Sequence, residues 1–333
     1  MSVLHAPLLA LAWLGRQGAR AIAALVFLGI ALPPLDALLK PFVTQAIFVL
    51  LAIAFLRVDP AALAGHLRRP AIVLAATAWT MLAIPILFGV GCRAAGVDTG
   101  APGLFLALML QAVASPMMAA PAFAAVMGLD AALVLVTLSL STALTPLTAP
   151  LFAYAFMGSA LTLSPPALGA KLFAILAGSA FVGTAIRRLA GAATIARYRE
   201  EIDGVNILVL FVFVGAVMEN LAAQLLAAPL LMLALVALAF ALFFAILGAT
   251  ALLFWKSGRA RALALGLMAA QRNMGLMLAA TGGVLPDLTW VYFALSQFPI
   301  YLTPQLLQPL VRRVLGPHAE RTDKGRQTEP EPG

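Results

Sequence analysis

Long apolar runs recur along the whole chain of 333 residues, and they constrain its fold more than any other feature. The runs lie approximately at 19–36, 40–57, 70–91, 102–127, 130–156, 166–186, 204–220, 227–255, 260–282 and 287–311. A helix that crosses a bilayer needs about 20 mostly apolar residues. Only 10% of the residues are charged, whereas a soluble domain carries roughly 25%. We therefore predict an all-α polytopic membrane protein with ten transmembrane helices, which excludes soluble enzymes, nucleic-acid-binding proteins and secreted modules.

The lysines and arginines between the runs predict the orientation of the chain, because short cytoplasmic loops retain positive charge. Seventeen lie on the side shared by both termini, three lie on the other side, and Arg272 lies inside a run. The seventeen are Arg16, Arg20, Arg57, Arg68, Arg69, Arg187, Arg188, Arg197, Arg199, Lys256, Arg259, Arg261, Arg312, Arg313, Arg321, Lys324 and Arg326, and the three are Lys40, Arg93 and Lys171. We expect a multi-pass protein of the plasma (inner) membrane with both termini cytoplasmic. Because topology accounts for the net charge of +8, we expect no nucleic-acid partner.

Short motifs repeat between the two halves of the chain. Leu144-Thr145-Pro146 recurs as Leu302-Thr303-Pro304, an offset of 158, and Asp130 and Asp287 open runs at an offset of 157. The same shift superposes Ser115-Pro116 on Asn273-Met274. Two halves of five spans follow, and since five is odd, the second half enters the membrane inverted, as in many transporters.

The repeat divides the chain into four segments. Residues 1–189 hold the first five-helix repeat and the sixth helix, and 190–203 form a cytoplasmic amphipathic linker. Residues 204–315 hold the rest of the second repeat. The segment 316–333 is rich in charge, Pro and Gly and is expected to be a disordered cytoplasmic tail.

Spans four and nine carry interruptions that a continuous membrane helix does not tolerate. Pro116 and Pro121 lie within one run, and each proline removes a backbone donor and clashes with the preceding turn. In span nine, Gln271, Arg272 and Asn273 form a strongly polar triplet between apolar stretches. Interrupted helices at matching positions of two inverted halves indicate a transport site near the middle of the membrane.

Arg272 is the one charge predicted to lie deep in the bilayer. It follows Arg261 by eleven residues, which at about 1.5 Å per residue places it roughly 16 Å into the membrane. A central arginine costs at least about 2.5–3.5 kcal/mol and needs compensation. Backbone carbonyls, nearby amides or an anionic ligand could provide it. Two roles stay open: a permanent structural clamp between helices, and a guanidinium fork that binds a carboxylate, sulfonate or phosphate.

Polar residues near the two interruptions complete the candidate binding site. The predicted substrate- or ion-binding residues are Gln111, Ser115, Pro116, Ser141, Thr145, Gln271, Arg272, Asn273 and Gln297. The sequence offers no intramembrane Asp, Glu or His in mid-span, and Cys92 is its only cysteine. We therefore predict no catalytic residues, no metal ligands and no cofactor.

Three segments around these interruptions carry a family resemblance: Ala114-Ser-Pro-Met-Met-Ala-Ala-Pro121, Met127-Gly-Leu-Asp-Ala-Ala-Leu133 and Gln271-Arg-Asn-Met-Gly-Leu276. They are similar to the bile acid:sodium symporter superfamily, and the resemblance extends over essentially the whole chain. It implies two inverted five-helix repeats with broken, crossing helices four and nine. It also implies a panel domain and a core domain that move an organic anion between them by alternating access.

The chain departs from the sodium-coupled members of that family at their ion sites. Their ninth span carries Glu, three residues, then Gln-Asn, and the Glu and the Gln hold sodium. Matching the Asn to Asn273 puts Arg272 at the Gln and Met268 at the Glu. The polar pair of the second ion site falls at about Ala120-Pro121. Sodium is thus poorly supported, and the hypothesis is that Arg272 replaces one coupling ion.

We predict a secondary transporter of a small organic anion that is not an enzyme, with Arg272 as the anion-binding or ion-replacing charge. Its partners are the substrate and the lipid bilayer. One alternative is a sodium-coupled symporter of bile-acid-like anions. Another is a channel or receptor-like membrane protein that keeps this fold without cycling.

Overall fold

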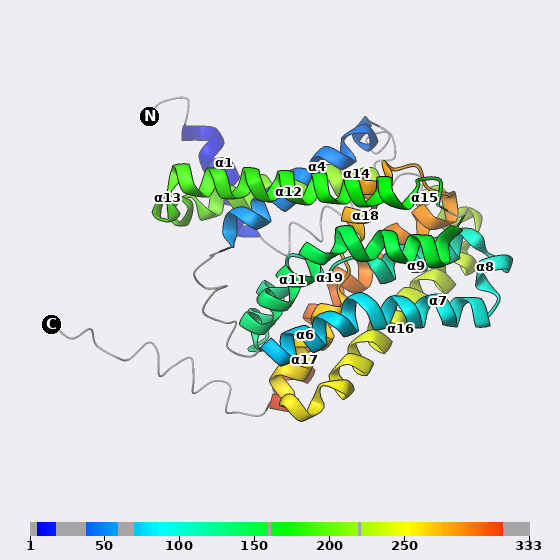
Figure 1. The fold of residues 1–333 in the computed structure, drawn as a ribbon. Helices are drawn as coiled ribbons and strands as arrows, with labels where there is room; N and C mark the ends of the chain where they lie inside the picture. The colour runs from blue at the N-terminus through cyan, green and yellow to red at the C-terminus, as the bar shows by residue number, and fades with distance from the viewer. Residues whose placement is uncertain (1–4, 18–37, 59–69, 159–160, 219–220, 316–333) are drawn as a thin grey trace.

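The computed structural model describes residues 5–17, 38–58, 70–158, 161–218 and 221–315. Every regular element among them is a helix, and the only strand-like feature there is one isolated pair of residues, Pro116 and Arg272. Figure 1 shows the helices in a thick bundle, with α13 and the start of α6 toward one end and α8 and α15 toward the other.

Five helical stretches of the described residues are long and apolar enough to cross a membrane, by length and composition. They are η1 (Lys40–Phe42) with α4 (Val43–Arg57), α6 (Pro70–Ala78) with the π-helical segment η2 (Trp79–Ala83) and α7 (Ile84–Ala94), α11 (Ala131–Phe152) with η3 (Ala153–Met157), α12 (Pro165–Ala190), and α16 (Pro229–Leu253). They coincide with the predicted second, third, fifth, sixth and eighth spans. Large apolar side chains such as Phe181 and Leu230 are 74% and 81% exposed, as expected where lipid covers the surface. The chain is therefore a multi-pass membrane protein by these criteria.

The other predicted spans take different forms. The run 102–127 is divided into α9 (Pro102–Val113) and α10 (Ala120–Val126), and 260–282 into α17 (Arg259–Ala270) and α18 (Met274–Thr281). The run 204–220 is α14 (Arg199–Val217), which begins earlier with a charged first turn, and 287–311 is α19 (Asp287–Leu315). The run 19–36 and the tail 316–333 lie outside the described residues.

Several short helices are not among the predicted runs. They are α1 (His5–Gln17), α8 (Val97–Gly100), α13 (Ala192–Arg197), α15 (Leu221–Ala227) and the 3-10 turn η5 (Trp255–Ser257). The predicted linker 190–203 is thus α13 followed by the first turn of α14.

Helix α1 packs antiparallel to the first half of α14. A Cβ atom at Gly204 would lie 2.1 Å from the Leu11 carbonyl oxygen, and one at Gly15 would lie 2.0 Å from that of Glu200, so only glycine fits at either position. The C-terminal end of α1 lies at the start of α14, where Arg16 pairs with Glu200. The N-terminal end of α1, at His5, therefore lies farther from the predicted cytoplasmic charges. The predicted cytoplasmic N-terminus therefore gains no support from α1, and residues 1–4 lie outside the described part.

Ion pairs join helix ends that carry the predicted cytoplasmic charges. Arg16 pairs with Glu200 at 2.7 Å, and Arg57 pairs with Asp203 at 2.6 Å. Another pair, Arg261 with Asp130 at 3.4 Å, joins the starts of α17 and α11. Exposed pairs like these contribute about 0–1 kcal/mol each, so they indicate which helix ends meet rather than what holds the bundle together.

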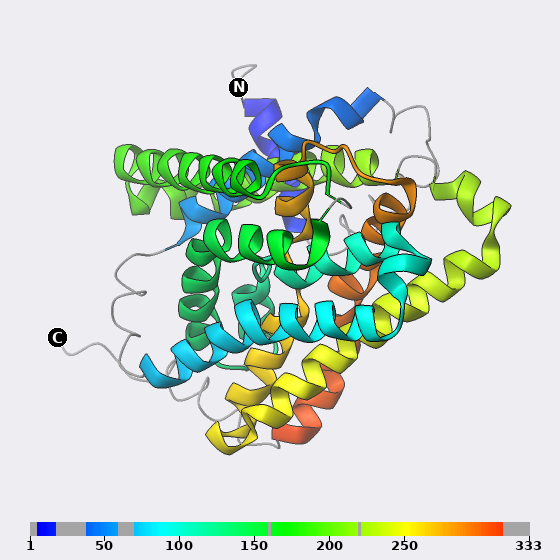
Figure 2. The same ribbon diagram turned by 45° about the vertical axis from the view of Figure 1, so that its right-hand side comes forward.

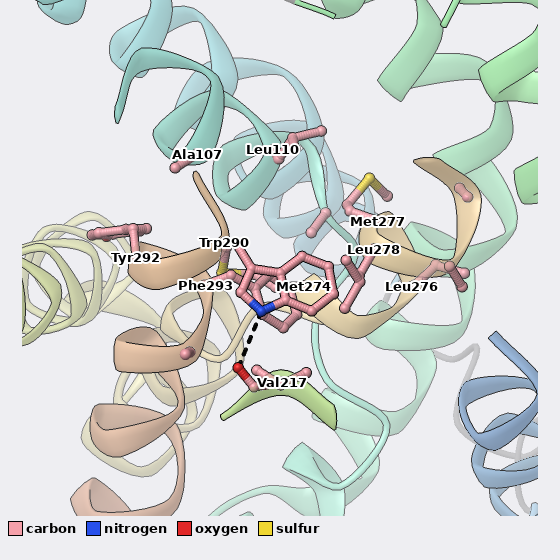
Figure 3. Close-up of a cluster of buried hydrophobic side chains, with 14 of the residues drawn as sticks. Ala107, Leu110, Val217, Met274, Leu276, Met277, Leu278, Trp290, Tyr292 and Phe293 are labelled. Atoms are coloured by element: carbon pink, nitrogen blue, oxygen red, sulfur yellow. Dashed lines mark hydrogen bonds between the residues drawn. The ribbon is translucent and has the colours of Figure 1, made fainter. Parts of the chain in front are cut away.

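The interior is built around α18 and the first half of α19. All residues of α18 are buried in the protein. A helix that is apolar on every side is typical of such an interior position. Figure 3 shows Met274 and Leu278 of α18 beside Trp290 and Phe293 of α19. The Trp290 indole N–H donates to the Val217 carbonyl at 3.2 Å. This hydrogen bond joins α19 to α14 next to α18.

Candidate binding site at the crossing of two interrupted helices

The first interruption follows from Pro116. Helix α9 ends at Val113, and Ala114 adopts an extended conformation with φ −62° and ψ 144°. Proline has no N–H and disfavours a helical conformation at the residue before it, so the helix cannot continue through Ser115. A new helix, α10, begins at Ala120 with Pro121 in its first turn, where proline is well tolerated.

The second interruption contains no proline and is stabilised by a cap. Helix α17 ends at Ala270, and Gln271 is extended with φ −84° and ψ 96°. Asn273 then caps α18, because its side-chain oxygen accepts a hydrogen bond from the Leu276 N–H at 3.1 Å. Asparagine is among the residues that favour this position. The polar triplet is therefore the connection between two half-helices.

The two interruptions cross each other and exchange backbone hydrogen bonds. The Met117 N–H donates to the Gln271 carbonyl at 2.8 Å, and the Asn273 N–H donates to the Ser115 carbonyl at 2.7 Å. These bonds make the isolated antiparallel pair of Pro116 with Arg272. Irregular backbone at membrane depth needs such protein partners, since lipid provides none.

The guanidinium of Arg272 is buried at this crossing and is held by carbonyl oxygens. The residue is 1% exposed. Its Nη1 donates to the Ala114 carbonyl at 2.9 Å, and Nη1 and Nη2 both donate to the Thr80 carbonyl at 3.2 Å. The Ala114 carbonyl is at the C-terminal end of α9, where the helix dipole is negative. Hydrogen bonds to a charged group contribute about 1.5–3 kcal/mol each.

The Thr80 carbonyl is free to accept these bonds because of the local helix geometry. In η2 the Ile84 N–H donates to the Trp79 carbonyl, five residues back, rather than to Thr80. The next residue in that register is Pro85, which has no N–H. The Thr80 carbonyl therefore has no donor from its own helix at that position, and Arg272 takes the place of one.

One edge of the guanidinium is not used. Arginine presents five N–H donors in a planar fork. Two on Nη1 and one on Nη2 are engaged by Ala114 and Thr80, which leaves Nε–H and the second Nη2–H on a common edge. Among the described residues the buried Nε has no hydrogen-bond partner. The same holds for a set of buried hydroxyl groups on α6, η2, the first interruption and α11: those of Thr77, Thr80, Ser115, Thr137, Ser141 and Thr142.

The remaining predicted site residues are divided between the crossing and the helix interiors. Gln271 is fully buried, and its Nε2 donates to the Ile300 carbonyl at 3.4 Å. Gln111 lies on α9, and its Oε1 accepts from the Tyr292 hydroxyl at 2.6 Å. Thr145 and Gln297 donate to carbonyls of their own helices, at Ser141 and Phe293 respectively. The backbone pairing of the two interruptions thus brings together Ser115, Pro116, Gln271, Arg272 and Asn273.

Two partners of this site are missing from the sequence prediction. Thr80 contributes a main-chain atom, which no side-chain motif reveals; the only sequence signal is Pro85 in the middle of an apolar run. Tyr292 lies in an apolar stretch of α19, and nothing in the sequence relates it to Gln111. In the described part of the chain, no group of three or more His, Cys, Asp or Glu side chains could hold a metal ion.

Comparison of the chain with protein-family models and with curated protein sequences gave no match. The family resemblance therefore rests on the three sequence segments around the interruptions.

Proposed function

We propose that the protein is a secondary transporter that moves a small organic anion across the membrane by alternating access. The proposed architecture has ten spans in two inverted five-helix repeats, with α9–α10 and α17–α18 as the broken, crossing fourth and ninth helices. The observation that carries this proposal is the buried Arg272 at the crossing of the two interruptions. Interrupted helices that meet at membrane depth are the usual setting of transporter binding sites.

The backbone pairing at the crossing supports the inverted repeat. An antiparallel pair has local two-fold symmetry, and here it relates Pro116 to Arg272, which are 156 residues apart. The repeated sequence motifs are 157 and 158 residues apart. The sequence separation of the paired residues at the crossing and the offset of the repeated motifs therefore agree to within two residues.

The carbonyl contacts of Arg272 favour the role in which its charge replaces a coupling ion over a role in which the side chain only binds an anion. Carbonyl oxygens such as those of Thr80 and Ala114 are ligands that a hard cation prefers. A guanidinium tethered among them supplies a positive charge that cannot dissociate. A sodium ion in the same place would be repelled, so we propose transport without sodium coupling.

The unused edge of Arg272 supports an anionic substrate. Nε–H and Nη2–H on one edge match the two oxygens of a carboxylate. In the described residues, no carboxylate is paired with this arginine. A monoanionic headgroup would neutralise the charge while the two carbonyls keep the guanidinium in place.

Uptake into proteoliposomes tests the proposal. Purified full-length protein is reconstituted and supplied with labelled small carboxylates and sulfonates, with a sodium gradient and with choline in its place. We expect saturable uptake and counterflow of at least one anion, at the same rate in both salts. Uptake that requires the sodium gradient would refute the ion-replacing role, and flux that neither saturates nor shows counterflow would indicate a channel.

Variants at Arg272 separate the binding role from the structural one. In Arg272→Gln the charge is lost, and we expect anion uptake to fall at least tenfold. Arg272→Lys keeps the charge but loses the planar fork, so we expect a raised KM with measurable uptake. If Arg272→Gln transports normally and only its melting temperature falls, the residue is a structural clamp.

A further inference from the structure

A groove on the apolar surface lies between the third predicted span and the end of α16. It has a volume of about 500 Å³ and is lined by Ala75, Ala78, Trp79, Leu82, Ala83, Ile86, Leu253 and Phe254. Seven of these eight side chains are purely apolar. The eighth, Trp79, has one polar group, and its indole N–H donates to the Thr250 hydroxyl at 2.8 Å. Figures 1 and 2 show α6 and α16 separating toward the end of the bundle where α16 turns into α17.

The groove faces the bilayer rather than the protein interior. Both walls belong to stretches long and apolar enough to cross a membrane. Ala75, Ala78, Leu82 and Leu253 are exposed, so no described segment of the chain covers them. Lipid chains are the solvent of such a surface, and an acyl chain is as apolar as this lining.

Basic residues follow one end of the groove along the chain. Phe254, the last residue of the lining, precedes the turn η5 (Trp255–Ser257), which contains Lys256 and leads to Arg259. The Arg259 guanidinium lies 6.0 Å from the centre of the Trp255 ring. A tryptophan with basic residues at the cytoplasmic end of a span is typical of the lipid headgroup level. Basic pockets between transmembrane helices on this side bind anionic lipid headgroups.

We propose that this groove is a binding site for an anionic phospholipid. One acyl chain lies along α6, η2 and α7, and the phosphate is held by Lys256 and Arg259. The apolar lining binds the acyl chain of any phospholipid, whereas the two cations favour a lipid whose headgroup is negatively charged.

The site bears on the crossing because the two share the segment η2. Trp79, Leu82 and Ala83 form the wall of the groove, while the Thr80 carbonyl on the buried side holds Arg272. A bound chain packs η2 from the lipid side. The proposal itself does not depend on transport, since it concerns lipid binding alone.

Native mass spectrometry of the full-length protein in neutral detergent tests the site. The probes are phosphatidylglycerol and phosphatidylcholine with identical acyl chains. We expect phosphatidylglycerol to be retained more tightly. The double variant Lys256→Gln/Arg259→Gln should reduce that preference by about 25-fold, taking roughly fivefold for each basic residue near the surface.

Filling the groove separates the chain from the headgroup. In Ala78→Phe both cations remain, and we expect the tightest lipid of either type to be lost while the melting temperature in detergent is unchanged. The matched control is Ala237→Phe on the exposed face of α16 outside the groove, which should retain both lipids. The proposal is overturned if the two lipids bind equally to the wild type, if Ala78→Phe binds phosphatidylglycerol like the control, or if Ala78→Phe instead converts a dimer to a monomer.

Discussion

Replacement of Pro85 by alanine tests whether the register of η2 makes the Thr80 carbonyl available to Arg272. In the wild type the Ile84 N–H is bonded to Trp79, and Pro85 has no N–H to offer. In Pro85→Ala a new N–H appears five residues after Thr80. It competes with Nη1 and Nη2, which both donate to that carbonyl at 3.2 Å.

Two opposing effects set the magnitude of the change. Removing a proline from the interior of a helix gains about 3 kcal/mol of stability. Losing the charged hydrogen bonds at Thr80 costs about 1.5–3 kcal/mol for each bond that is broken. With Arg272 present and one of its two bonds to Thr80 lost, the net gain should fall to between zero and about 1.5 kcal/mol. With Arg272→Gln, the full gain of about 3 kcal/mol should appear, which is a coupling of about 1.5 kcal/mol or more between the two positions.

A double-mutant cycle measures this coupling. The free energy of unfolding is determined in mixed micelles for the wild type, Pro85→Ala, Arg272→Gln and the double variant. Pro146→Ala in α11 is the matched control, because Pro146 also lies inside a long apolar helix, while Arg272 bonds to Thr80 and Ala114 instead. Its effect should be the same in both backgrounds. The reasoning fails if Pro85→Ala stabilises the protein equally with and without the arginine.

Three further sets of variants test other contacts of the site. Met268→Glu together with Arg272→Gln rebuilds the sodium-coupled pattern of the family that the chain resembles, so its melting temperature should rise with sodium concentration, whereas the Met268→Gln/Arg272→Gln control should not respond. Tyr292→Phe leaves the buried Gln111 oxygen without its 2.6 Å bond and should cost about 1–3 kcal/mol of unfolding free energy; a change below about 0.5 kcal/mol would show that this bond is unimportant. Asn273→Ala removes the cap of α18 and should cost about 1 kcal/mol, while Asn273→Asp keeps the cap acceptor and should cost less; equal losses would contradict the capping role.

The parts of the fold that depend on local patterns are predictable from the sequence. Apolar run length locates five long helices to within a few residues, and Pro116 and the triplet 271–273 mark the two interruptions. In both cases the signal is intrinsic to the segment: a missing N–H, or polar groups that lipid cannot satisfy. The α1 helix is missed because its 13 residues are too short for a span and its partner, α14, is distant in sequence.

The partners of Arg272 are harder to predict for a physical reason. Its compensation comes from main-chain oxygens, which every residue has, so no residue type identifies them. What distinguishes Thr80 and Ala114 is the absence of a donor: Pro85 removes one, and the end of α9 leaves the other. The burial cost of the arginine predicts that partners exist, while only the arrangement in space identifies them.

A fixed guanidinium has consequences for energy coupling that a dissociable ion does not. The Arg272 side chain is bonded to the backbone of the other interruption at Ala114 and of η2 at Thr80, so in the proposed alternating-access cycle it would move with these segments in every step. When a monoanion is bound, its charge and that of Arg272 sum to zero. When the site is empty, the proposed carrier keeps one positive charge there. The membrane potential is worth about 2.3 kcal/mol per charge for each 100 mV, and it would act only on the return of the empty carrier. Exchange of one anion for another avoids that step altogether. For the proposed transporter, we therefore expect exchange, or net movement driven by the anion gradient and the potential, rather than symport with a cation.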